Sequence, residues 1–231
     1  MPYFYSFDMY YIILVVPALI LAMYAQFKVS STFSKYSSVQ NTKGITGAQV
    51  SRKLLDINGL NDISINQING NLTDHYNPSN KTVNLSETVY SSTSVAAIGV
   101  AAHETGHALQ HAKLYAPLNV RNAIFPIVRF SSSVSLPLAL LGFISGLEIL
   151  ISIGIILFSA VVLFQLITLP VEFNASKRAL GMLYDYGVLS QDEIVMAKKV
   201  LSAAALTYLA SAITGIANLL RLILLSRSRR R

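Results

Sequence analysis

The chain has 231 residues, of which 53% are hydrophobic and only 13% charged, with a net charge of +7 at pH 7 and no cysteine. A soluble domain usually carries about 25% charged residues, so this composition favours a membrane protein, and the missing cysteines exclude disulfides, thiolate zinc sites and a cysteine nucleophile. No nucleic-acid recognition motif accompanies the positive charge, which we expect to contact the lipid bilayer and not nucleic acid.

The N-terminal segment, residues 1–27, is predicted to be a membrane anchor. No charged residue occurs from Met9 to Phe27, a length close to the ~20 residues that cross the hydrocarbon core of a bilayer. The segment lacks a basic leader and a small-residue cleavage site, so we predict a retained anchor and not a removable signal peptide.

Residues 28–132 are the polar part of the chain, with a predicted order of helix, strands and helix. Gly44–Leu60 reads as a helix, with Thr46 as its N-cap and Gly59 as its stop signal. Three short strands are predicted at Asp62–Ile68, Leu72–Tyr76 and Thr82–Ser86. The second and third strands are expected to pair across the turn between them, and a further helix capped by Ser94 follows.

Residues 133–169 are predicted to form a helical hairpin in the membrane. The run is too long for one span, and its only charge is Glu148, which lies with two glycines near the centre. Two helices are expected, at about Ser133–Gly146 and Ile149–Leu169. A hairpin would return the chain to the face of the membrane that it left, so residues 170–199 are expected to share a face with the polar part.

The C-terminal segment, residues 200–231, contains a third apolar run, Val200–Leu220, and a basic tail. We expect this run either to cross the membrane or to lie on the membrane surface. Eight basic residues near the ends of the apolar runs, on the expected face of the polar part, favour a cytoplasmic catalytic face by the positive-inside rule. The tail favours the opposite face if Val200–Leu220 crosses the membrane. These eight residues are Lys28, Lys35, Arg121, Arg129, Lys177, Arg178, Lys198 and Lys199.

The run VAAHETGHAL, Val100–Leu109, carries the strongest chemical signal. Residues four apart lie on one face of a helix, so His103 and His107 can direct both imidazoles at one Zn2+ ion. Glu104 would project beside the metal, where it can take a proton from a zinc-activated water and pass it to the leaving amine. Gly106 would let another element pack closely. Two buried histidines with only a structural role would need other polar partners.

A third protein ligand is needed, with a fourth position left for water. Glu172, just past Pro170, would emerge on the same membrane face as the histidines, and we predict that it is this ligand. His111 would lie ~6 Å further along the helix axis, too far to reach the same ion. His75 lies in a predicted strand without ligand spacing, and we expect it to be a structural or substrate-side residue.

The motif HETGH, followed by EFNASKRA, resembles the YugP-like neutral zinc metallopeptidases of bacterial membranes, as do DHYNP, SVAAIGVAAHETGHALQ and AAALTYLA. The predicted elements make an α+β membrane protein, mainly α-helical, with a small β-sheet beside the zinc helix and about four membrane helices. The family is similar to gluzincins of the HtpX and prenyl-protease type. That resemblance implies a zincin-like catalytic core, with His103, His107 and Glu172 as metal ligands and Glu104 as the base.

The chain departs from the wider gluzincin pattern at one position. That pattern places an aspartate four residues after the ligand glutamate, where it orients a zinc histidine, and this chain has Ser176 there. We expect Asn174 to orient one of the histidines instead. Tyr208, in AAALTYLA, and His75 are candidate oxyanion stabilisers, although Tyr208 reads equally well as a packing residue. The strand at Thr82–Leu85 is expected to offer a free edge to an extended peptide.

The sequence therefore predicts a membrane-embedded zinc endopeptidase. Its expected substrates are proteins or peptides, including membrane proteins. Residues 28–132 and 170–199 would together form the catalytic part. Two alternatives stay open. One is a non-catalytic membrane scaffold whose structural zinc has four protein ligands, with His75 or His111 as the fourth. The other is a zinc hydrolase that acts on a non-protein amide.

Overall fold

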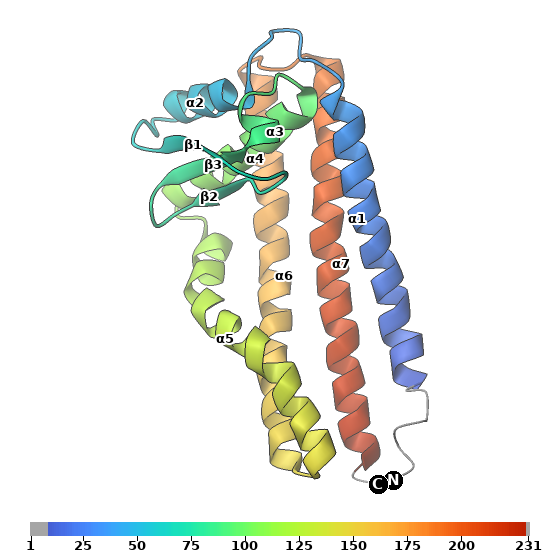
Figure 1. Cartoon of the computed structure of the whole chain (residues 1–231). Helices are drawn as coiled ribbons and strands as arrows, with labels where there is room; N and C mark the ends of the chain where they lie inside the picture. Colours follow the sequence, from blue (N-terminus) through green and yellow to red (C-terminus); the bar gives the residue numbers. More distant parts are fainter. Residues whose placement is uncertain (1–8, 230–231) are drawn as a thin grey trace. The chain divides into compact units, whose positions relative to one another are not determined.

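The computed structural model describes residues 9–229, and within them the chain is mostly helical with one small sheet (Figure 1). A short π-helix, Tyr11–Val15, precedes the other elements. These are α1 (Val16–Ser37), α2 (Gly47–Ile57), β1 (Ser64–Ile68), β2 (His75–Asn77), β3 (Thr82–Ser86), α3 (Glu87–Tyr90), α4 (Val95–Ala112), α5 (Ala116–Ser145), α6 (Glu148–Asp185) and α7 (Gln191–Arg229).

Among the described residues, four helical segments are long and apolar enough to cross a membrane. They are Tyr11–Ser37, Ala116–Ser145, Glu148–Asp185 and Gln191–Arg229. The expected fold class, a mainly helical membrane protein with a small sheet beside the histidine-bearing helix, is confirmed.

The chain folds into two compact units. The first, which we call the membrane unit, comprises Met1–Gln26, Val120–Leu169 and Thr207–Arg231. The second, which we call the site unit, comprises Phe27–Asn119 and Pro170–Leu206. The site unit holds the sheet and α4, together with parts of the long helices.

The sheet of the site unit has the order β1-β3-β2 in the described chain, with β1 parallel and β2 antiparallel to β3. The predicted pairing of the second and third strands is confirmed. The expected free edge at Thr82–Leu85 is wrong, because β3 is the central strand and the two edges belong to β1 and β2. β3 carries the fully buried Val83 and Leu85, and a central position removes both of its edges from solvent.

Helix α4 lies between the sheet and a helical core. Its alanine face, with Ala97, Ala101 and Ala108, packs against Val83 and Leu85 of β3. Small side chains on this face let the strands approach the helix closely. The opposite side of α4, which carries Ile98, packs against residues of α2, α6 and α7, among them Leu54, Ala179, Leu183 and Ala197.

Local signals set the beginnings of α2 and α4 as expected. Thr46 caps α2, and with Gln49 it forms a reciprocal capping box. Ser94 caps α4 by accepting a hydrogen bond from the backbone N–H of Ala97 at 3.2 Å. The left-handed backbone of Gly59, with φ of 73°, follows the end of α2.

The two helices on either side of Gly146 are longer than the sequence indicated. α5 begins at Ala116 and α6 continues to Asp185, because the prolines at positions 126, 137 and 170 lie inside these helices and do not end them. Membrane helices tolerate proline when their surroundings satisfy the freed carbonyl groups. In the membrane unit, the Arg229 guanidinium donates a hydrogen bond to the Phe143 carbonyl oxygen at 2.8 Å, which brings the end of α7 to the α5–α6 turn.

Candidate metal centre

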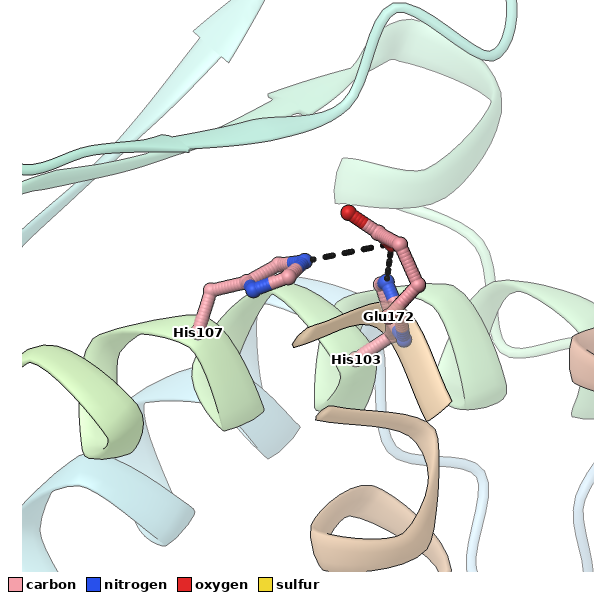
Figure 2. Close-up of side chains that lie close together, drawn as sticks. All are labelled: His103, His107 and Glu172. Carbon is pink, nitrogen blue, oxygen red and sulfur yellow. Dashed lines mark hydrogen bonds and ion pairs between the residues drawn. The ribbon is translucent and has the colours of Figure 1, made fainter. Parts of the chain in front are cut away.

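His103 and His107 project from one face of α4 toward the carboxylate of Glu172, which enters from α6 (Figure 2). The Glu172 Oε2 atom lies 3.2 Å from His103 Nε2 and 3.5 Å from His107 Nε2. One ligand atom from each of the three side chains lies within 4.8 Å of the other two. All three residues belong to the site unit.

The three side chains fit a zinc ion. Ligands ~2.0–2.1 Å from a tetrahedral zinc lie about 3.4 Å from one another, which matches the two contacts of Glu172. Two imidazoles and one carboxylate, with a fourth position left open, form a donor set typical of catalytic zinc. His107 and Glu172 are buried and His103 is partly buried, so a cation would also compensate the buried carboxylate.

A glycine allows α6 to come close enough to complete this group. A Cβ atom added at Gly106 would lie 2.7 Å from the Ala175 carbonyl oxygen, a distance that folded proteins do not tolerate. The backbones of α4 and α6 are therefore in contact one turn from Glu172. This confirms the expectation that Gly106 makes room for a neighbouring element.

Each histidine is oriented by a different side chain. Ser176 Oγ lies 3.1 Å from His103 Nδ1, so the serine occupies the orienting position itself. Gln110 Oε1 lies 3.0 Å from His107 Nδ1. Asn174, which we expected to orient a histidine directly, instead accepts a hydrogen bond from Gln110 Nε2 at 3.0 Å and so lies one step further from the metal centre.

Glu104 is buried next to the two histidines, with 7% of its surface exposed. Burial is the largest cause, and together with the negative charges of Glu172 and Asp74 it raises the pKa of Glu104 to about 7. The neighbouring His103 and a backbone hydrogen bond at Tyr76 act in the opposite direction on this pKa. Among the protein groups alone, the Glu104 carboxyl is therefore set to exchange a proton close to neutral pH.

The structure does not bring His75 into this group. Its ring contacts the Thr73 carbonyl oxygen at 2.9 Å and the Asn84 side chain at 3.2 Å. Because side chains alternate along a strand, His75 and Asn84 lie on the face of the sheet opposite to Tyr76 and Val83, which pack toward α4. Its role as an oxyanion stabiliser has no support in this position.

Two further candidates named from the sequence are His111 and Tyr208. His111 is engaged by the Tyr76 hydroxyl, 2.9 Å from its Nδ1 atom, and is absent from the metal-binding group found among the described residues. Tyr208 belongs to the membrane unit and is partly exposed on α7. Sequence reasoning missed Gln110 and Tyr76. Gln110 could have been found, because it lies three residues after His107 and so on the same helix face.

Comparison with known proteins extends over nearly the whole chain. A family model described as "Putative neutral zinc metallopeptidase" matches residues 11–227. A protein of Bacillus subtilis (strain 168), named "Putative membrane protease YugP", is 51% identical over 217 residues, which cover 94% of this chain and 96% of that protein. No solved structure matches the chain.

Proposed function

The chain belongs to the family described as "Putative neutral zinc metallopeptidase", and from this premise we propose that it is a membrane-embedded, zinc-dependent endopeptidase. The observation that carries the proposal is the convergence of His103, His107 and Glu172 next to the buried Glu104. In this proposal the first three residues hold one Zn2+ ion and Glu104 is the general base.

When bound, zinc supplies Lewis-acid chemistry, since it lowers the pKa of water and polarises a carbonyl oxygen. The protein residues supply the rest. Glu104 accepts a proton from the attacking water and donates it to the leaving amine, a role that suits a carboxyl with a pKa of about 7. The buried surroundings of Glu104 and Glu172 exclude bulk water, which strengthens the electrostatic interactions within the site.

The proposed substrates are proteins or peptides, membrane proteins among them, that bind in an extended form. β2 is an edge strand of the sheet and contacts α4, and the backbone N–H of Tyr76 donates a hydrogen bond to the Glu104 carboxylate. An extended segment that pairs with the edge of β2 would pass next to Glu104. This assigns to β2 the substrate edge that the sequence placed on β3.

Two observations support a catalytic site over a scaffold with structural zinc. That alternative needs a fourth protein ligand, and its two candidates make other contacts: His75 with Thr73 and Asn84, and His111 with Tyr76. A hydrolase acting on a non-protein amide would use the same catalytic residues. This alternative would be distinguished from a peptidase by a protein that binds zinc but cleaves no protein substrate.

The proposed location is the cell membrane, with several spans and with the catalytic residues on the cytoplasmic face. Four membrane-length helices support the first part. Six basic residues of the site unit that flank the apolar runs support the second, namely Lys28, Lys35, Lys177, Arg178, Lys198 and Lys199.

The test is zinc analysis combined with casein proteolysis on the purified full chain and on Glu104→Gln. We expect both proteins to bind one zinc per chain and the variant to lose at least about 100-fold in turnover, because it has lost its general base. A variant that keeps more than about a tenth of the wild-type turnover would remove Glu104 from this role. Wild-type protein without zinc would contradict the proposal as a whole.

A further inference from the structure

Gln110 is a polar side chain in the interior of the site unit, and all its surface is buried. A buried amide is costly unless its donors and acceptor are satisfied. Its Oε1 atom faces His107 Nδ1 at 3.0 Å, and its Nε2 atom faces the Val171 carbonyl oxygen at 2.8 Å and Asn174 Oδ1 at 3.0 Å. The residue therefore bridges α4, which carries the two histidines, and α6, which carries Glu172.

The neighbours of Gln110 determine which way its amide points. Arg178 Nε donates to Asn174 Oδ1 at 2.7 Å, and since a guanidinium has no acceptor, this Asn174 atom must be the oxygen. The Val171 carbonyl is also an acceptor. The Gln110 NH2 group must therefore face α6 and donate two hydrogen bonds to it. Its oxygen is left to face His107.

This orientation determines the tautomer of His107. The Gln110 oxygen accepts only, so His107 Nδ1 must carry a hydrogen and donate it. In the neutral ring, Nε2 then has a free lone pair. Nε2 is the His107 atom that lies 3.5 Å from Glu172 Oε2, and so the atom directed at the proposed metal position.

The same amide holds the turn of α6 next to Glu172. Val171 directly precedes Glu172, and Pro170 precedes Val171. Proline has no N–H, so this turn lacks one hydrogen bond of a regular helix. The two hydrogen bonds from Gln110 to Val171 and Asn174 tie the turn to α4.

We propose that Gln110 is a positioning residue of the metal centre, which holds His107 in its Nδ1-protonated tautomer and holds Glu172 at the correct distance from both histidines. The inference rests on the proposed function, because it assigns the oriented atoms to zinc. A single side chain would thus position two of the three proposed metal ligands, His107 and Glu172.

The test compares two variants of the full chain in detergent. Gln110→Met keeps a similar volume and removes all three hydrogen bonds. Thr105→Val is the matched control, since Thr105 is equally buried on α4 but its hydroxyl bonds only to Ala101 of the same helix. We expect Gln110→Met to weaken zinc binding by about 10- to 100-fold, measured by competition with a chelating dye, and Thr105→Val to bind like the wild type.

A second measurement reads the tautomer without metal. Nitrogen NMR on metal-free protein with labelled histidine, of which the chain has four, should show His107 with its hydrogen on Nδ1 in the wild type. That signature should be lost in Gln110→Met and kept in Gln110→Glu, whose carboxylate still accepts from Nδ1. If Gln110→Met does not fold, the tautomer of His107 in the wild type still tests the proposal.

The outcomes separate the two proposals. A Gln110→Met protein that binds zinc within twofold of the wild type overturns the positioning role, as does an equal loss in Thr105→Val. A wild-type His107 with its hydrogen on Nε2 also overturns it. If the wild type shows the Nδ1 tautomer but binds no zinc, the proposed function fails and the assignment of the tautomer stands.

Discussion

Gly106 of α4 lies so close to Ala175 of α6 that a single added methyl group would come within 2.7 Å of the Ala175 carbonyl oxygen. We therefore expect Gly106→Ala to push α6 away from α4. Overpacking of this kind costs about 1–3 kcal/mol of stability. The shift should also separate Glu172 from the histidines, so zinc content should fall along with the thermal midpoint.

Gly99 offers a control for this change on the same helix. A Cβ atom at Gly99 would lie 3.5 Å from the Ala197 side chain, an ordinary contact. Gly99→Ala should gain up to about 1 kcal/mol from helix propensity and keep its zinc. Equal zinc content in the two variants would show that the contact at Gly106 does not control the metal centre.

Removal of Glu172 should abolish stoichiometric zinc binding. Glu172→Ala leaves two imidazoles, and we expect metal analysis to find much less than one zinc per chain. Glu193→Ala is the matched control, because Glu193 is also a buried glutamate of the site unit but accepts its hydrogen bonds from Thr42 and Ser190. That variant should lose stability and keep its zinc. Unchanged zinc in Glu172→Ala would move the third ligand to another residue.

Loss of the Ser176 hydroxyl should weaken zinc binding without preventing it. Ser176→Ala leaves His103 Nδ1 without its partner at 3.1 Å, and we expect a loss of about tenfold in zinc affinity, measured by chelator competition. Ser51→Ala controls for the removal of a buried hydroxyl, since Ser51 donates to the Ala101 carbonyl oxygen and has no histidine partner. A tenfold loss in both variants would indicate a general effect of destabilisation.

Three single cysteines can establish the orientation in the membrane, because the chain has no cysteine of its own. Exposed positions are available in the site unit at Ser79, at the α5–α6 turn at Ser145 and at the end of α7 at Ser228. A maleimide that cannot cross the membrane should label Ser145→Cys and Ser228→Cys in intact cells. It should label Ser79→Cys only after the cells are opened.

Two other labelling patterns would be informative. Labelling of Ser79→Cys alone in intact cells would place the catalytic residues outside. Labelling of Ser145→Cys and Ser228→Cys from opposite sides would contradict the contact between Arg229 and the Phe143 carbonyl oxygen, which brings these two ends together.

Features encoded within a few residues could be predicted from the sequence. The caps at Thr46 and Ser94 each depend on a side chain and a backbone group three residues away. The pairing of His103 with His107 on one helix face follows from helical geometry alone. The approach of Glu172 was predictable because a charged residue next to an apolar run is expected to have a partner.

Features that depend on contacts between distant parts of the chain could not be predicted as well from the sequence. The order of three short strands is set by the burial of β3 against α4, and neighbouring residues do not encode it. The sequence predicts too short an α5, because Pro126 lies within the helix and a proline at such a position would end many soluble helices. The sequence predicts a direct contact between Asn174 and one of the histidines. In the structure, Gln110 lies between Asn174 and His107 and hydrogen-bonds to both.

Glu172 is carried by α6, one continuous helix that begins at Glu148 and includes an apolar, membrane-length segment. A newly made chain therefore brings together only two of its three proposed metal-binding side chains until this helix has formed and packed beside α4. Under the proposed function, the chain would not cleave peptide bonds before α6 has packed beside α4.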